Sequence, residues 1–212
     1  MMSGNNGTGV LQWLERFSIK HCCFDFGGTL FDFEPVHLAA FRHALNLDPE
    51  SRQARELEQV LRASLQAGVD SVDISQRLAV AFGLSDDPLQ IVLSKRQRVE
   101  ELVANSELTP TSRDLLVEVA DSIDVSIVTR GLKDSTLAIV NRSLPVRLVS
   151  RIAVFGRADC AERWHKSDLL ETALSQGRFP FNSCGYVADA DGDAIVASSL
   201  KVLFYRFQPF LT

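Results

Sequence analysis

The sequence predicts an α/β protein in which a doubly wound parallel sheet is interrupted by an inserted all-helical cap. From residue 107 onward, short runs rich in β-branched residues alternate with helical stretches. These runs are apolar at odd and even positions alike, as expected for parallel strands that are covered on both faces. Between the first predicted strand and this alternating part lies a long segment in which no strand is credible.

The predicted strands and helices follow one another along the chain. The strands are residues 20–26, 124–129, 151–156, 184–189 and 201–207, and the helices are residues 111–121, 132–142, 166–176 and 191–200. This alternation is typical of a doubly wound core. Only the N-terminal tail is expected to be a flexible linker.

The segment 34–106 shows helical spacing instead. Apolar residues such as Leu57 and Leu61 recur at helical intervals, and the turn signals "NLDPES" and "GLSDDP" divide the segment into about four helices. We therefore expect residues 1–33 and 107–212 to form the α/β core and residues 34–106 to form the cap. A cap inserted after the first strand would sit above the carboxyl ends of the strands, where open α/β sheets bind ligands.

Composition and charge exclude several classes of function. The formal charge of −5 argues against a nucleic-acid partner, which normally requires a concentrated basic patch. No apolar run approaches the roughly 18 residues that span a bilayer, and the first ten residues lack the features of a secretory signal. The four cysteines show neither metal-ligand spacing nor a disulfide-dense pattern. We expect a soluble, cytoplasmic protein with reduced thiols and no membrane partner.

Polar residues close several of the predicted strands. Asp25, Thr129 and Asp189 stand at carboxyl ends of strands, and Lys166 opens the helix that follows the strand at 151–156. Each of them alone could be a helix cap or a turn former. Four such residues at one edge of one sheet indicate a functional site.

The residue types at this edge suit phosphoryl transfer. Two carboxylates, Asp25 and Asp189, offer the hard oxygen ligands that Mg²⁺ prefers. A carboxylate can also attack phosphorus to form an aspartyl phosphate. The backbone N–H groups of "GGT" after Asp25 can approach phosphate oxygens. Thr129 can donate a hydrogen bond and Lys166 can bring positive charge to the transferring group.

Four motifs in this order resemble those of the haloacid dehalogenase superfamily. They are "CCFDFGGTLFD", "SIVTRG", "HKSDLL" and "YVADADGDAIVA". In addition, "FDFEPVHLAAFRHAL" resembles the entry to the helical cap in the phosphoglycolate-phosphatase and β-phosphoglucomutase branch. The resemblance implies a Rossmann-like core with a helical cap. It also implies a Mg²⁺-dependent phosphatase that acts on a small phosphorylated metabolite through an aspartyl phosphate.

The resemblance assigns metal-binding roles to single residues. It implies that Asp25 is both the nucleophile and a Mg²⁺ ligand, and that Gly27 supplies its carbonyl oxygen to the metal. Asp189 would be a further ligand. Asp193 would reach the metal through water or orient the site. Asp191 would cap the following helix or substitute for one of its two neighbours.

Other residues would hold the phosphoryl group. The resemblance gives this role to Thr129 and Lys166, and the N–H of Gly28 would contribute to the phosphate cradle. Arg130 would either clamp a substrate anion or pair with a surface carboxylate. Asp32 matches the last acid of the first motif, whose usual role is structural.

Position 27 departs from the family's pattern. Phosphatases of the superfamily carry an acid there that protonates the leaving oxygen and later activates water, whereas this chain carries Gly27. General acid–base catalysis contributes roughly 10²–10⁴ in rate, so its loss raises the barrier by about 3–5 kcal/mol. The handicap is largest for alkyl phosphates and smaller for acyl or aryl phosphates. His37, His165 and Arg130 are candidate replacements.

Two other functions stay open on the sequence alone. One is a non-catalytic scaffold that binds phosphate or a metal. The other is phosphonate hydrolysis, which in this superfamily combines a small residue at position 27 with a Schiff base on a cap lysine. The segment 34–106 has one lysine, Lys95, and its run "SKRQR" is typical of a solvated helix face. The sequence sets neither the substrate nor the oligomeric state.

Overall fold

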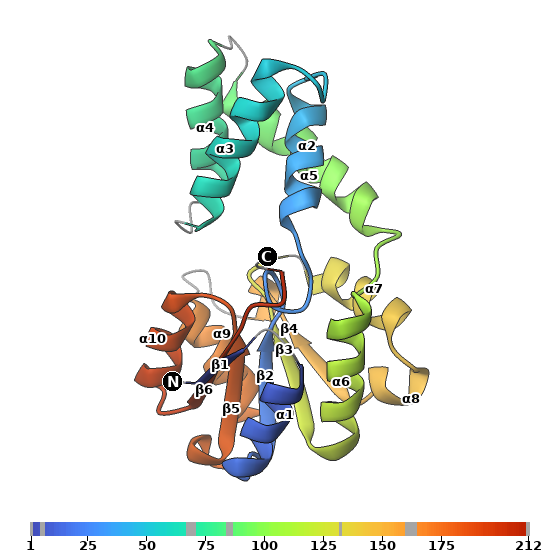
Figure 1. The fold of residues 1–212 in the computed structure, drawn as a ribbon, viewed down its shortest axis with the longest axis vertical. Helices are drawn as coiled ribbons and strands as arrows, with labels where there is room; N and C mark the ends of the chain where they lie inside the picture. The colour runs from blue at the N-terminus through green and yellow to red at the C-terminus, as the bar shows by residue number, and fades with distance from the viewer. Residues whose placement is uncertain are drawn as a thin grey trace. The chain divides into compact units, whose positions relative to one another are not determined.

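A six-stranded sheet forms the centre of the α/β part (Figure 1). All strand pairs are parallel, and the strand order is β1-β6-β5-β2-β3-β4. The strands are β1 (Met2–Gly4), β2 (His21–Asp25), β3 (Asp124–Val128), β4 (Ile152–Phe155), β5 (Cys184–Ala188) and β6 (Leu203–Phe207). This computed structural model describes residues 2–4, 7–66, 71–83, 87–131, 133–159 and 165–210. All five strands predicted from the sequence are present.

Helices cover both faces of the sheet. The longer helices of this part are α1 (Gly7–Arg16), α6 (Pro110–Ser122), α7 (Lys133–Ser143), α9 (Lys166–Ser175) and α10 (Asp191–Ser199). The short ones are α8 (Val146–Val149), η1 (Arg157–Asp159) and η2 (Phe181–Ser183). α9 packs on β2, β3 and β4, and α10 packs on β5 and β6, whereas α1 contacts α6 and β6. Successive strand residues point to opposite faces, and Tyr186 clusters with α9 while Gly185 faces α1. The predicted doubly wound fold is confirmed.

The central strands are buried throughout because both faces are covered. Every residue of β2 and of β5 is buried. In β2, for example, the neighbouring residues Cys22, Cys23 and Phe24 are all fully buried although their side chains alternate between the faces. This explains why the strands are apolar at both parities, as in other covered parallel sheets.

The expectation of a flexible N-terminal tail is wrong. β1 pairs with β6, and α1 packs its apolar residues Val10, Trp13 and Leu14 into the core. The ring of Trp13 lies 5.5 Å from that of Tyr205 and approaches β5 at Gly185. Glycine and asparagine dominate "MMSGNNGTGV" and hide the helical i, i+3, i+4 spacing that follows.

The chain divides into two compact units, residues 1–32 with 106–212, and residues 33–105. The second unit contains α2 (Glu34–Ala44), α3 (Arg52–Gln66), α4 (Ser71–Phe82) and α5 (Pro88–Val103). The number of helices is that expected from the sequence, and the turn signals "NLDPES" and "GLSDDP" fall at the starts of α3 and α5. Their shared core includes Phe41, Leu57, Leu61, Ile74, Leu78 and Ile91. At the start of α5, Pro88 occupies the first turn and the Asp87 side chain accepts a hydrogen bond from the N–H of Leu89 at 3.0 Å.

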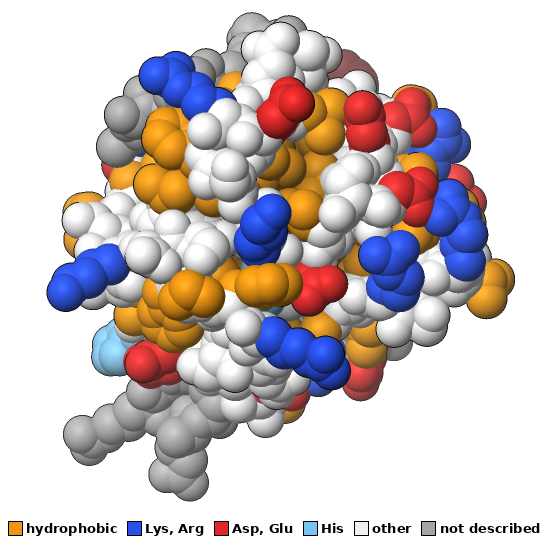
Figure 2. Space-filling view, turned by 90° about the horizontal axis from the view of Figure 1, so that it is seen from below, with side chains coloured by type: hydrophobic (Ala, Val, Ile, Leu, Met, Phe, Trp, Pro, Cys, Tyr) orange, Lys and Arg blue, Asp and Glu red, His pale blue; other side chains and the backbone are white. Residues whose placement is uncertain are grey.

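The surface shown in Figure 2 carries charges of both signs. On this face, the described Lys and Arg side chains are interspersed with Asp and Glu, and the apolar side chains form small separate groups. Within the described residues, no helix is both long and apolar enough to span a membrane.

Candidate functional site

Three neighbouring strands end at the same edge of the sheet and bring distant parts of the chain together. Asp25 is the last residue of β2 and pairs with Val128 of β3, so that Thr129 follows directly beside it. Phe24 pairs with Val187 of β5, and Asp189 follows that strand. Parallel pairing therefore places these polar side chains at one edge.

Lys166 joins two of the carboxylates. It is the first residue of α9, and its Nζ lies 3.0 Å from Asp25 Oδ1 and 2.5 Å from Asp193 Oδ1. The Lys166 side chain is 15% exposed, and those of Asp25 and Asp193 are 7% and 3% exposed. Such charge-assisted contacts are strong because little water competes with them.

Three carboxylates converge on one point. Asp25, Asp189 and Asp193 each offer one oxygen, and these three atoms lie within 4.8 Å of one another. Asp193 Oδ2 is buried and has no hydrogen-bond partner among the described residues. Lys166 supplies one positive charge to three acids, and an excess of buried negative charge is unfavourable without a counterion. A hard divalent cation fits this donor set.

Burial changes the proton affinities of these groups. It raises the pKa of Asp25 to about 7, with Lys166 opposing this and the other two carboxylates reinforcing it. Burial also raises the pKa of Asp189. Burial alone would lower the pKa of Lys166, but Asp25 and Asp193 together raise it. Burial and the mutual repulsion of the acids account for the raised pKa values of Asp25 and Asp189, and the charge of Lys166 offsets them only in part.

The turn after β2 packs tightly against Asp189. Gly28 has a φ of +82°, and a Cβ at this position would lie 2.5 Å from Asp189 Oδ2. Glycine is therefore required at this point. The Gly28 N–H donates to the carbonyl of Phe31 at 2.9 Å, so its part in a phosphate cradle stays a prediction that requires this bond to open.

Gly27 has no such backbone requirement. Among the described glycines, only Gly28 and Gly83 have positive φ. Gly27 and Phe31 form an isolated parallel bridge. In it, the N–H of Phe31 donates to the carbonyl of Phe26, and the carbonyl of Phe31 accepts from the N–H of Gly28. These bonds use neither the N–H nor the carbonyl oxygen of Gly27. The bridge therefore does not use the carbonyl oxygen of Gly27, and a metal-binding role requires that this oxygen is not used.

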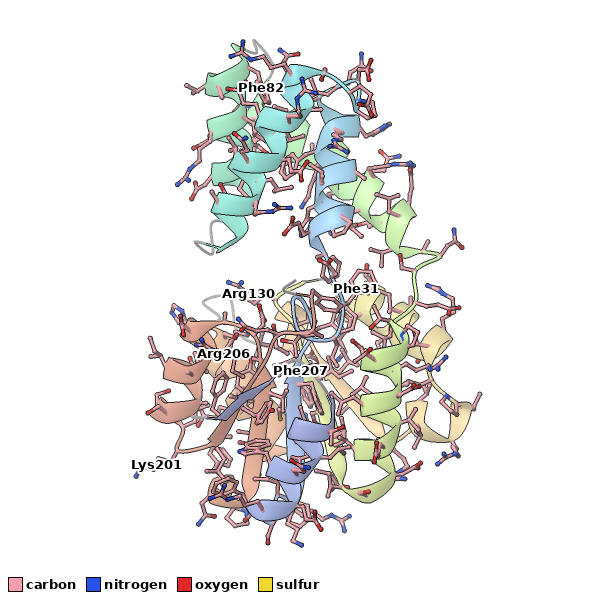
Figure 3. All side chains as sticks on the ribbon, in the orientation of Figure 1. Phe31, Phe82, Arg130, Lys201, Arg206 and Phe207 are labelled. Atoms are coloured by element: carbon pink, nitrogen blue, oxygen red, sulfur yellow. The ribbon has the colours of Figure 1, made fainter. Side chains whose placement is uncertain are left out.

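Thr129 is buried and Arg130 is exposed. The backbone N–H of Thr129 donates to the carbonyl of Phe155 at 2.9 Å, and its Oγ1 accepts a hydrogen bond from the N–H of Gly131 at 3.0 Å. That bond leaves the hydroxyl hydrogen of Thr129 to be donated. Arg130 lies at the same end of the sheet (Figure 3). No carboxylate of the described part of the chain forms an ion pair with it.

Sequence reasoning missed three residues that support the carboxylates. Thr29 Oγ1 donates to Asp189 Oδ1 at 3.0 Å, and the Tyr186 hydroxyl donates to Asp193 Oδ1 at 3.2 Å. Gln208 donates to the backbone carbonyl of Asp189 at 3.0 Å. Thr29 stands in the quoted "GGT", so its place in a motif could have drawn attention to it.

Asp191 does not cap α10, so this expectation is wrong. Ala190 is the N-cap residue, and Asp191 is the first residue of the helix. The Asp191 side chain is 87% exposed and forms an ion pair with Arg206. It does not belong to the convergent carboxylate group. Asp32 is half-buried and ends the first segment of the α/β unit.

The two histidines proposed as acid–base replacements have other surroundings. His165 is exposed at the N-cap of α9, where its backbone N–H donates to Asp168 Oδ2 at 2.8 Å. His37 belongs to the second unit. Burial lowers the pKa of His37 to about 3, and the charge of Lys95 acts in the same direction. A histidine with this pKa is neutral near pH 7 and is a poor proton donor there.

The expectation that Lys95 lies on a solvated face is wrong. Lys95 is 7% exposed, and its Nζ lies 5.3 Å from the centre of the Phe41 ring. It shares the buried face of α5 with Ile91 and Val103, at helical spacing from both. Its sequence neighbours Arg96 and Arg98 form the solvated face instead, where they pair with glutamates.

A family comparison agrees with this arrangement. The model of the haloacid dehalogenase-like hydrolase family matches residues 19–175, more than half of the chain. The chain belongs to this family. The match covers the region of Asp25, Thr129 and Lys166 but ends before Asp189. Among proteins with curated descriptions, none matched the sequence.

Several solved structures share the fold of this chain. The HAD-hydrolase YfnB from Bacillus subtilis bound to magnesium has a TM-score of 0.70 and 15% identity, over 92% of this chain and 91% of its own. A haloacid dehalogenase-like hydrolase from Streptococcus pneumoniae has a TM-score of 0.66 and 19% identity, over 89% and 84%. CbbY from Rhodobacter sphaeroides in complex with phosphate has a TM-score of 0.61 and 18% identity, over 88% and 84%.

Proposed function

We propose that this hydrolase is a Mg²⁺-dependent phosphatase of a small phosphorylated metabolite and works through an aspartyl phosphate on Asp25. The observation that carries the proposal is the convergence of Asp25, Asp189 and Asp193 beside Lys166. Within the described residues, this cluster combines a candidate nucleophile with the oxygen ligands of a hard cation. The magnesium and phosphate named for YfnB and CbbY support the same choice of ligands.

The chemistry would run in two displacements. A carboxylate oxygen of Asp25 attacks phosphorus, a P–O bond forms, and the substrate oxygen leaves with the electron pair of the broken bond. Water then attacks the same phosphorus, and the bond between phosphorus and the Asp25 oxygen breaks. Asp25 recovers its carboxylate, and both protons of the water leave with inorganic phosphate. Lys166 and the Thr129 hydroxyl would bind the phosphoryl oxygens, and Arg130 would clamp a further substrate anion. Mg²⁺, held by the three carboxylates and the Gly27 carbonyl, would offset the charge that builds up on the phosphoryl group.

Gly27 shapes the substrate range. Since position 27 carries no acid, the leaving oxygen receives no proton from it. Aryl and acyl phosphates release weakly basic leaving groups, so they should be turned over better than alkyl phosphates. We therefore propose a site altered at its acid–base position.

The proposal is tested by hydrolysis of p-nitrophenyl phosphate with MgCl₂ and with EDTA. Turnover should require Mg²⁺ and should be lost in Asp25→Asn. Asp121→Asn is the matched control, because Asp121 is an exposed carboxylate that pairs with Arg147 on the surface. Turnover that survives in Asp25→Asn would contradict the proposed nucleophile.

A second candidate function is a non-catalytic scaffold that binds a metal or phosphate. Two observations favour it: position 27 has no acid, and the N–H of Gly28 is already bonded to Phe31. It predicts Mg²⁺ or phosphate binding in calorimetry without turnover of any aryl or acyl phosphate. Phosphonate hydrolysis is a weaker alternative, favoured by burial that lowers the pKa of Lys95 to about 8. It requires an adduct on Lys95 that borohydride traps.

We also propose that the protein works in the cytoplasm. The thiols of Cys22, Cys23 and Cys184 are free and buried, as expected in a reducing compartment. Partners other than the substrate are not required by this function, and the mixed charges of Figure 2 fit the absence of a nucleic-acid partner.

A further inference from the structure

Tyr186 places a polar group inside the core beneath the carboxylates. It lies in the middle of β5, is fully buried, and its ring lies 6.2 Å from that of Phe204. A buried phenol normally finds a hydrogen-bond partner. Here the partner is Asp193, whose Oδ1 accepts the hydroxyl hydrogen at 3.2 Å.

Two donors therefore meet at the same oxygen of Asp193. Lys166 Nζ approaches Asp193 Oδ1 at 2.5 Å, and the ring of Tyr186 lies 5.9 Å from that ammonium. The phenolic hydroxyl of Tyr186 has one hydrogen to donate, and Asp193 Oδ1 accepts it. A carboxylate held at one oxygen by two donors cannot rotate freely.

The second carboxylate oxygen of Asp193, Oδ2, indicates why the side chain is held in place. Asp193 Oδ2 is buried and has no partner among the described residues, although the residue is only 3% exposed. A buried carboxylate oxygen without a partner is costly unless a ligand completes it. Asp193 also belongs to the convergent group with Asp25 and Asp189.

We propose that Tyr186 is a positioning residue for the cation site, which holds Asp193 Oδ1 against Lys166 so that Oδ2 is kept for a divalent cation or its bound water. This inference rests on the proposed Mg²⁺ site and adds a residue on β5 that touches neither substrate nor metal. Partners of this kind commonly contribute about 10- to 100-fold to metal affinity. Tyr186 acts on binding through Asp193 and supplies no proton to the reaction.

The competing explanation is that Tyr186 only fills the core. Tyr186→Phe separates the two, because it removes the hydroxyl and keeps the ring. The matched control is Tyr205→Phe: Tyr205 is also a buried strand tyrosine, 2% exposed, whose ring packs on Trp13 in the same unit. A packing role predicts similar small effects from both substitutions.

The first measurement is calorimetric titration of the full chain with MgCl₂. The dissociation constant should rise about 10-fold or more in Tyr186→Phe and stay within twofold of wild type in Tyr205→Phe. The thermal midpoints of the two variants without Mg²⁺ should be similar. A wild type that binds Mg²⁺ and a folded Tyr186→Phe that binds it equally well would overturn the positioning role alone.

The second measurement needs no change at position 186. The chain contains two tyrosines, so incorporation of 3-fluorotyrosine gives two fluorine resonances, and Tyr205→Phe assigns them. Saturation with Mg²⁺ should shift the Tyr186 resonance and leave that of Tyr205 in place. An unmoved Tyr186 resonance in a protein that binds Mg²⁺ overturns the inference. A wild type that binds no Mg²⁺ overturns the proposed function, and the inference with it.

Discussion

The ammonium of Lys166 lies 3.0 Å from a carboxylate oxygen of Asp25, and both side chains are largely removed from water. This pair ties the first turn of α9 to the end of β2, the central strand of the site. Its partner Asp193 extends the tie to α10. A single cation thus connects three elements at the edge where the chemistry is proposed.

Replacement of Lys166 should cost much more stability than replacement of an exposed lysine. Lys166→Met leaves Asp25 and Asp193 buried without their cation, which should lower the free energy of unfolding by about 3 kcal/mol at pH 8 without Mg²⁺. Lys133→Met is the control, because the Lys133–Asp159 pair is about a third exposed and should contribute about 0–1 kcal/mol. Urea unfolding measures both, and equal losses would contradict the assignment.

Introducing an acid at position 27 should raise activity selectively. In Gly27→Asp, kcat/KM for an alkyl phosphate should rise by about 10²-fold or more, because the leaving alkoxide then receives a proton. The rise should be smaller for p-nitrophenyl phosphate. Gly192→Asp adds the same charge at an exposed position near the site and should show no such selectivity. An equal change for both substrates would rule out an acid–base effect.

Gly28 should tolerate no side chain. Gly28→Ala places a methyl group against Asp189 Oδ2 at a φ of +82°, so it should lower the free energy of unfolding by more than about 1 kcal/mol and weaken Mg²⁺ binding. Gly192→Ala meets no atom within 4 Å in α10 and should stabilise the protein by up to about 1 kcal/mol. Urea unfolding and calorimetry report the two effects. A Gly28→Ala protein with unchanged Mg²⁺ affinity would show that Asp189 is free to move.

Acid should destabilise the protein partly through His21. This residue is 3% exposed, its Nε2 lies 2.9 Å from Ser126 Oγ, and its buried Nδ1 has no partner among the described residues. Burial lowers the pKa of His21, while the charge of Asp124 opposes this. The unfolded chain therefore takes up a proton below about pH 6.5 that the folded protein refuses, so stability falls as the pH falls.

The measurement for His21 is urea unfolding between pH 7 and pH 5. The loss of unfolding free energy should be shallower in His21→Gln than in wild type, by up to about 1.4 kcal/mol per pH unit. His43→Gln alters an exposed histidine and should follow wild type. Comparison of variants cancels the contributions of the other buried groups. Parallel curves for wild type and His21→Gln would exclude His21 as a source of acid sensitivity.

The part of the fold in which strands and helices alternate was predictable from the sequence, because burial on both faces leaves strands that are apolar at odd and even positions alike. The predicted strands at 124–129 and 184–189 differ from β3 and β5 by one residue at their ends. The N-terminal helix α1 was missed because its apolar positions follow a run rich in glycine and asparagine. The exposure of Lys95 was predicted wrongly because a charged run indicates only that most of its residues face solvent. One face of the helix that contains the run can still be buried.

The site was predictable where its residues stand in motifs and not where they only support others. Asp25, Thr129, Lys166 and Asp189 end strands or open a helix, and such positions are visible in a sequence. Thr29 reaches Asp189 across 160 positions of chain, a contact that depends on tertiary structure. Tyr186 stands among the apolar residues of its strand. Nothing in the sequence distinguishes a tyrosine whose hydroxyl supports a carboxylate from one that only packs its ring in the core.

The order of strands also means that β2 is synthesised on the ribosome well before the two strands that pair with it. β2 lies at the centre of the sheet, yet its neighbours β3 and β5 begin only at Asp124 and Cys184. At roughly 5–20 residues per second, synthesis from Asp25 to Asp124 takes on the order of 5–20 s. During that interval the nascent chain presents "HCCF" without a neighbour, and we expect it to need shelter by a chaperone or by the helices that emerge next.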